Sequence, residues 1–199
     1  MGTVIFRPSA DSSNSNWAAN SGSVLYNRLS EATSDGDSTY ISTATSGASY
    51  TCALSGALPS GAQVTGITLY VLHRSSGFVS ETFSASLIVN SSSVTSVSDT
   101  GMPSAYTLTS CSASWTSLTL SNMSVTVSDT GTGTTSDKVT VPGTSFVTQI
   151  YAVVTFKDML NGYCKINGAI KQLSGGYIKI DGVWKTLTMS KVNINSVWK

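Results

Sequence analysis

Hydrophobic and polar residues alternate with a period of two along most of the first 156 residues. In the run from 64 to 74, Ile67, Leu69 and Val71 share one side, and Thr68, Tyr70 and Leu72 take the other. This period, with many β-branched and aromatic residues, indicates β-strands. Three further runs follow the same pattern: 83–89, 123–127 and 146–156. In the last run the alternation places Phe146, Thr148, Ile150, Ala152, Val154 and Phe156 opposite Val147, Gln149, Tyr151 and Val153.

Turn-forming clusters separate these runs. Their spacing favours a jelly-roll-like antiparallel β-sandwich, so the fold class is all-β. A first strand at Val4–Phe6 can pair with 146–156 and close the sandwich, which predicts one domain over 1–157. The segment 24–32 fits either a short turn of helix or a strand followed by a loop. The turn clusters are Pro59–Gly61, Ser75–Gly77, Asp99–Gly101 and Asp129–Gly131.

The segment 158–199 contains a repeat with a period of 14 residues. Ile166, Ile180 and Ile194 correspond, as do Ile170, Trp184 and Trp198. Each copy carries a two-residue turn signal, and Asn-Gly and Asp-Gly are the preferred pairs for tight β-hairpins. The repeat therefore predicts three hairpins, a small β-meander region after the sandwich. The turn pairs are Asn167-Gly168, Asp181-Gly182 and Asn195-Ser196.

The predicted hairpin register gives each copy two different faces. Ile180 lies opposite Val183 on an aliphatic face, and Lys179 lies opposite Trp184 on the other, with Tyr177 alongside. A lone hairpin is marginal in water and needs a packing partner. The aromatic face is then either buried in assembly or open as a binding surface. The candidate ligand- or partner-binding residues of this region are Tyr177, Lys179, Trp184 and Trp198.

Two further tryptophans lie in polar surroundings in the first domain. Trp17 follows Ser-Asn-Ser-Asn, and Trp115 follows Ser-Ala-Ser. Each fits a stacking platform for a sugar ring or an anchor at the rim of the sandwich. Both are therefore candidate binding residues.

Composition changes the picture mainly through charge. Only 11% of the residues are charged and the net charge is +1, with six lysines and two aspartates in 158–199. Neither region has a dense basic patch, so we expect no nucleic-acid partner.

No apolar run approaches the length of a membrane span, which is about 20 residues. The start of the chain lacks signal-peptide features, which predicts synthesis in a host cytoplasm and release by lysis.

Few residues carry catalytic chemistry. His73 is the only histidine, and the chain has no nucleophile elbow, phosphate loop or dinucleotide motif, which predicts a non-enzymatic protein without cofactors. The acidic cluster Glu31, Asp35 and Asp37 fits either a calcium-binding loop or an ordinary turn. Cys52 and Cys111 are either buried thiols or a disulfide, and no zinc pattern is present.

Two sets of motifs resemble proteins of tailed-bacteriophage virions. The stretches Phe6–Asp11, Trp17, Leu29–Glu31 and Asp35–Ile41 resemble their jelly-roll domains. The repeated Gly-Tyr-x-Lys-Ile-x-Gly-Val-Trp-Lys resembles C-terminal hairpin repeats of phage and prophage surface proteins. The first copy departs from that pattern, with Ile170 in place of tryptophan.

The resemblance implies a virion structural protein exposed on the particle: a capsid decoration, a head fibre or a minor tail protein. Its partners would be other virion proteins and copies of itself, for example in a trimer. The alternative is a carbohydrate-binding adhesin module that recognises host-surface glycans. The two hypotheses differ in whether the aromatic residues serve assembly or adhesion.

Overall fold

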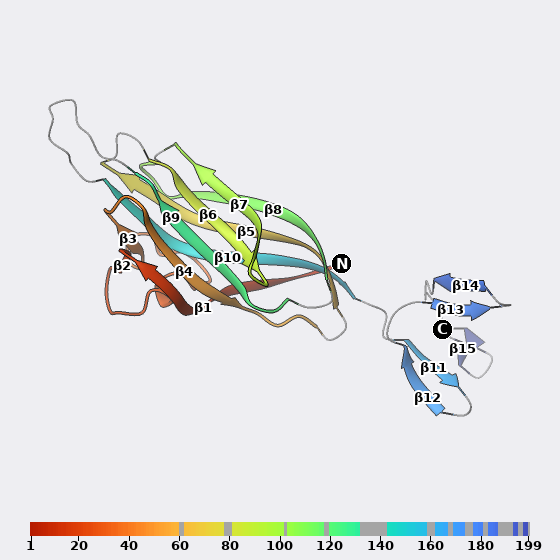
Figure 1. Ribbon diagram of the computed structural model, residues 1–199. Coiled ribbons are helices and arrows are strands. Elements are labelled where there is room, and N and C mark those ends of the chain that lie inside the picture. The colour runs from red at the N-terminus through yellow and green to blue at the C-terminus, as the bar shows by residue number, and fades with distance from the viewer. Residues whose placement is uncertain are drawn as a thin grey trace.

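The first 158 residues form an antiparallel β-sandwich, and short β-hairpins follow it (Figure 1). The computed structural model describes residues 1–59, 62–77, 81–101, 103–117, 120–131 and 143–158. After residue 158 it describes the backbone of the strands only: 162–166, 169–173, 177–180, 183–186, 193–194 and 197–198. No helix in these ranges is long and apolar enough to cross a membrane.

Within the described ranges, ten strands build the sandwich, and the all-β class predicted from the alternation is confirmed. One short 3-10 turn, η1 (Tyr26–Arg28), lies in the segment 24–32, for which the sequence allowed either a turn of helix or a strand followed by a loop. The strands are β1 (Gly2–Ser15), β2 (Ala18–Ala19), β3 (Ile41–Thr43), β4 (Ala48–Ser55), β5 (Ala62–Ser76), β6 (Phe83–Val89), β7 (Ser92–Asp99), β8 (Thr107–Ser117), β9 (Met123–Asp129) and β10 (Thr144–Asp158).

The strands form two layers. Sheet I has the order β8-β5-β10, and the free edge of β10 pairs with β3 and with the first half of β1. Sheet II has the order β1-β4-β9-β6-β7 and uses the second half of β1. β1 passes from one sheet to the other between Phe6, which pairs with β10, and Arg7, which pairs with β4. The predicted closure is confirmed, because Val4 pairs with Val154 and Phe6 with Ala152.

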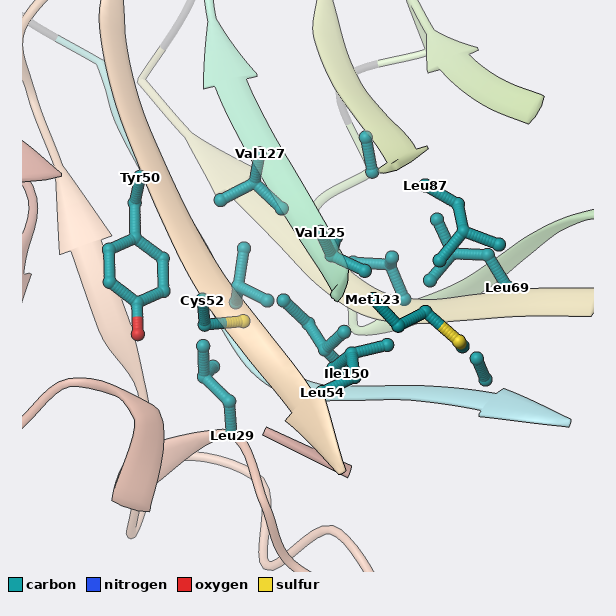
Figure 2. Close-up of a cluster of buried hydrophobic side chains, with 14 of the residues drawn as sticks. Leu29, Tyr50, Cys52, Leu54, Leu69, Leu87, Met123, Val125, Val127 and Ile150 are labelled. Atoms are coloured by element: carbon teal, nitrogen blue, oxygen red, sulfur yellow. The ribbon is translucent and has the colours of Figure 1, made fainter. Parts of the chain in front are cut away.

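The core lies between the two sheets, where alternate residues of each strand point inward (Figure 2). Ile67, Leu69 and Val71 of β5 are all buried, as their spacing predicts. Tyr50 and Cys52 of β4 face them from sheet II. Cys52 and Cys111 are free thiols, so the structure has no disulfide between them.

A β-bulge in β10 overturns part of the predicted alternation. The pairing with β5 shifts register between Val147 and Gln149, so one extra residue enters the strand. As a result Val147 is fully buried, whereas Phe146 lies on the outer face against Arg74. The prediction that Phe146 shares the inner face with Ile150 is therefore wrong at this end of the strand.

The C-terminal repeat forms the three predicted pairs of strands. β11 (Gly162–Ile166) pairs with β12 (Ala169–Leu173), β13 (Tyr177–Ile180) with β14 (Val183–Thr186), and β15 (Asn193–Ile194) with β16 (Val197–Trp198). Ile180 lies opposite Val183 and Lys179 opposite Trp184, so this predicted register is confirmed. The turn residues between the strands fall outside the described residues. The division into domains 1–157 and 158–199 remains a prediction.

Candidate functional site

The outer face of sheet I combines aromatic rings with hydroxyl groups. Its strands lie in the order β1, β10, β5 and β8, and their outward residues form rows across the sheet. One row places Tyr151 opposite Tyr70, and Tyr70 opposite Ser110. The next row places Val153 opposite Thr68, and Thr68 opposite Ser112. Rows on the same face are about 7 Å apart along the strands.

Two tyrosines form a stacked pair at the centre of this face. The rings of Tyr70 and Tyr151 lie 4.8 Å apart with an interplanar angle of 12°. The guanidinium of Arg7 lies 5.5 Å from the Tyr151 ring and donates a hydrogen bond to the carbonyl of Glu31. Tyr151 is therefore flanked on both sides. On its other side, Tyr70 pairs with the small, exposed Ser110 of β8, so no large side chain lies directly opposite it there, and we call this the open side of Tyr70.

An open hollow of about 210 Å³ lies on the same face, next to the tyrosine pair. The hydroxyls of Thr68 and Ser112 are 2.8 Å apart within it, and Thr65 donates a hydrogen bond to the carbonyl of Thr155. None of its lining residues is charged. The hollow is lined by Thr65, Gly66, Ile67, Thr68, Ser112, Ala113, Ser114 and Thr155.

A cationic and aromatic cluster marks the other end of this face. The Arg74 guanidinium lies 3.8 Å from the Phe146 ring and 5.2 Å from the Tyr106 ring. It also pairs with Asp37 at 2.8 Å, and this hydrogen bond holds the pKa of Asp37 below its usual value. Tyr40 packs edge-on against Phe146. The cluster fixes the loops at this end of the sheet.

Neither tryptophan of the first domain is an exposed platform. Trp17 is 3% exposed and belongs to the core, because Asn14 bonds to both the N–H and the carbonyl of Trp17 and holds the chain in a turn. Trp115 is half-buried and packs against the core from β8. Both indole N–H groups are buried. The interpretation of Trp17 and Trp115 as stacking platforms is therefore wrong, and both act as anchors of the sandwich.

The predicted binding residues of the repeat are placed by their backbone only. Tyr177 and Lys179 lie on β13, Trp184 on β14 and Trp198 on β16. Their side chains fall outside the described residues. These four positions remain predictions.

The acidic cluster forms a turn rather than a set of ligands directed at one point. The Thr39 hydroxyl lies within hydrogen-bond distance of the Glu31 and Asp35 carboxylates and can donate to either one of them, and Asp35 also accepts a hydrogen bond from the Thr39 N–H at 2.9 Å. Asp37 turns to Arg74 instead. In the ranges that the structure describes, no three His, Cys, Asp or Glu side chains are arranged to hold a metal ion. The ordinary-turn interpretation accounts for these contacts.

His73 is an interior residue at the end of β5. Its ring stacks on Phe83 at 4.1 Å, and its Nε2 lies 3.3 Å from the Asp99 carboxylate. The side chain is fully buried, and this burial lowers the pKa of His73. In the described part of the protein, the His73 side chain is not accessible to a substrate.

Close to His73, two carboxyl groups are buried without a cationic partner among the described residues. Glu81 and Asp129 both contact the hydroxyl of Ser145, and all three are buried. Burial raises the pKa of Glu81, and the nearby charges of Asp129 and Asp99 add to the effect. No local pattern in the sequence marks this cluster, because its members are far apart along the chain.

Sequence analysis also missed the tyrosine pair and the hollow. The alternation indicated that Tyr70 and Tyr151 each lie on the side of their strand opposite the buried residues. Their contact with each other depends on the register between β5 and β10. That register includes two shifts and follows from no local pattern. A glycine inside a predicted strand, Gly66, was the one available signal for the hollow.

Comparison with known proteins identifies no family. No protein-family model matches the chain, and none of the curated proteins is similar to it. Among solved structures it is similar to a carbohydrate-binding module, the C-terminal CBM6 of the laminarinase LamC from Zobellia galactanivorans. The identity is 9% and the TM-score 0.43, over 77% of this chain and 100% of that one.

Two other solved structures are similar at the same level. One is the module CBM6cm-2 from Cellvibrio mixtus lichenase 5A in complex with cellotriose, with 6% identity, a TM-score of 0.40, and coverage of 76% of this chain and 95% of that one. The other is the Agl-KA catalytic domain, with 10% identity, a TM-score of 0.39, and coverage of 83% and 31%. Likeness at TM-scores below 0.5 carries no information on what this chain binds.

Proposed function

We propose that this chain is a non-catalytic carbohydrate-binding protein that holds a glycan on the outer face of sheet I. One observation carries the proposal: the open side of Tyr70 lies one row from a hollow lined by hydroxyl groups and free of charge. Tyr70 replaces the tryptophans of the first domain as the proposed binding residue, because Trp17 is buried and Trp115 packs inward against the core.

The chemistry of this face suits a neutral sugar. An aromatic ring offers an apolar surface to the C–H groups of a pyranose. The hydroxyls of Thr68 and Ser112 both donate and accept hydrogen bonds, as sugar hydroxyls do. An apolar surface with a few placed polar groups is the usual composition of a small-molecule site. Since no lining residue of the hollow is charged, we expect neutral glycans to bind better than acidic ones.

The first test is calorimetric titration of the full chain with neutral hexasaccharides, together with a uronic-acid oligosaccharide. Tyr70→Ala removes the open ring, and we expect it to weaken binding of the neutral sugars by at least tenfold, about 1.4 kcal/mol. Thr68→Val removes a hydroxyl of the hollow with little change in volume. We expect a smaller loss, because one hydrogen bond to a neutral group contributes about 1 kcal/mol.

The opposite sheet offers a matched control. Thr51 and Thr126 form a cross-strand hydroxyl pair on sheet II, also 2.8 Å apart. Thr126→Val therefore makes the same chemical change on the other outer face, and we expect binding to stay unchanged. Equal losses from Thr68→Val and Thr126→Val, or no binding by the unaltered chain, would reject the proposed site.

As a second function, we propose that the chain is displayed on a phage particle. This proposal is supported by the three hairpin repeats after the sandwich and by the low charge of the chain. Glycan binding on sheet I and display on a particle are compatible. Electron microscopy and mass spectrometry of purified virions test the placement, which fails if the chain is absent from the particle.

A further inference from the structure

Gly66 lies at a bulge within β5, a strand that a glycine weakens. Its φ lies outside the left-handed region, unlike those of Gly22, Gly36, Gly47 and Gly77. Backbone conformation therefore does not require a glycine at this position. The explanation has to come from the space around it.

The space above Gly66 is free. A Cβ placed there would meet a single neighbour, the carbonyl oxygen of Ala113 at 3.5 Å, which is an ordinary contact. At Gly2 and Gly56 the corresponding Cβ would lie 2.6 Å from the Phe156 ring and 2.7 Å from the Phe6 ring. Those two glycines make room for packed side chains. Gly66 makes room for nothing in the described part of the protein.

β5 has a bulge at this point, and a recess lies where Gly66 has no side chain. Val64 and Ile67 are both buried, and two residues, Thr65 and Gly66, lie between them toward the outer face. Gly66 thus forms the floor of the hollow, with the hydroxyl-bearing residues of β5, β8 and β10 around it. Glycine inside a strand often marks a close approach of a ligand.

We propose that the recess above Gly66 is the specificity-determining subsite for the exocyclic hydroxymethyl group of a neutral hexose. This inference rests on the proposed function and names its ligand class. The volume of about 210 Å³ is below that of a pocket for a drug-sized ligand, so it takes one sugar unit at most. Thr68 and Ser112 offer hydroxyls to the group that enters.

The position of Tyr70 sets the direction of the glycan. Tyr70 follows Thr68 by two residues on the same face of β5, about 7 Å along the strand. Gly66 is four residues from Tyr70, about 13 Å along the strand. One sugar places its hydroxymethyl group over Gly66, and a sugar further along the same glycan stacks on the open side of Tyr70. The glycan therefore runs along β5 rather than across the sheet.

Two probes that differ only in the hydroxymethyl group test the subsite: cellohexaose and xylohexaose. Gly66→Ala fills the recess by one methyl group, and Gly66→Val fills it further. We expect Gly66→Ala to weaken cellohexaose binding about tenfold, Gly66→Val to weaken it more, and both to change xylohexaose binding by less than about twofold. The thermal midpoint of Gly66→Ala should be unchanged or raised, because alanine suits a strand better than glycine.

Ala53→Val on the outer face of sheet II is the matched control for added bulk, and it should leave both affinities unchanged.

The results distinguish the proposed subsite from the proposed function. If the unaltered chain binds no neutral hexasaccharide, the proposed function fails. If Tyr70→Ala loses binding while Gly66→Ala retains it, or if both glycans lose equally, the subsite fails and the function stands. A sharp fall in the midpoint of Gly66→Ala would give the glycine a structural reason and also overturn the subsite.

Discussion

Glu81 has an environment that differs strongly from that of a free side chain. It is 4% exposed, shares the Ser145 hydroxyl with Asp129, and has one carboxyl oxygen without a hydrogen-bond partner. One hydroxyl carries one proton and can donate to only one of the two carboxyl groups. A protonated Glu81 can donate to Ser145 in turn, which agrees with the raised pKa of Glu81.

This environment predicts how stability depends on pH. The pKa of Glu81 is raised above its ordinary 4.5, so the folded chain holds a proton here that the unfolded chain releases. The stabilisation is full below pH 4.5 and is lost as the pH rises through the folded pKa. We therefore expect Glu81→Gln, which resembles the protonated acid, to become more stable relative to the unaltered chain as the pH rises.

Urea denaturation of both chains between pH 4 and 8 measures this difference. The lowered pKa of His73 acts in both chains, so its contribution largely cancels in the comparison. Glu81→Ala serves as the control that removes the carboxyl group without keeping its hydrogen bonds. A difference in unfolding free energy that shrinks with rising pH would contradict a raised pKa.

At the level of elements, Asp11 connects β1 to the segment that follows it. Its two carboxylate oxygens accept hydrogen bonds from the N–H groups of Leu25 and Tyr26 at 3.2 and 2.8 Å. The Tyr50 hydroxyl donates to the same carboxylate at 2.5 Å. These contacts attach the η1 segment to β1 and β4 of sheet II. Removing the carboxylate would leave three donors without their partner.

We expect Asp11→Ala to lower the free energy of unfolding by about 1–3 kcal/mol, because the part-buried donors of Leu25 and Tyr50 lose their acceptor. Asp35→Ala is a suitable comparison, since Asp35 caps the Thr39 N–H at an exposed turn. Loss of such a cap costs about 1 kcal/mol. Equal effects of the two substitutions in urea denaturation would show that Asp11 has no special role.

The sequence predicted elements well where each element depends on its own residues. The period of two located β5, β6 and β9, and the turn pairs fixed the register of the hairpins. It failed where a bulge changes the period, as at Val147 and Phe146, since one extra residue reverses the faces without a local signal. Sites that depend on pairing between distant strands were also missed, the contact of Tyr70 with Tyr151 among them.

The tryptophans show a related limit. Trp17 stands in a polar stretch, and a polar stretch suggests a surface position. In the structure, the hydrogen bonds of Asn14 hold the local turn and the ring enters the core. Polar neighbours describe the backbone of a loop, while the direction of one large side chain depends on the cavity that it fills. The composition of a loop therefore does not predict whether its aromatic residue is available for binding.

At the scale of the whole molecule, β1 connects the two layers. Its first half pairs with β10 in sheet I and its second half with β4 in sheet II. Because the last strand of the sandwich pairs with the first, closure is complete at Phe156, which pairs with Gly2. The core residues described between the sheets all lie within the first 156 residues. Nothing after residue 158 is needed to complete these pairings.

This closure predicts the result of a truncation. We expect residues 1–158 to fold with a thermal midpoint within a few degrees of that of the full chain, since the truncation removes no residue of the described core. Glycan binding on sheet I should be retained. The hairpins need a packing partner, so we expect self-association to depend on residues 159–199. Sedimentation velocity and calorimetric titration of the two chains measure both effects. An unfolded truncated chain would show that the hairpins contribute to the stability of the sandwich, and equal self-association would remove them as the assembly device.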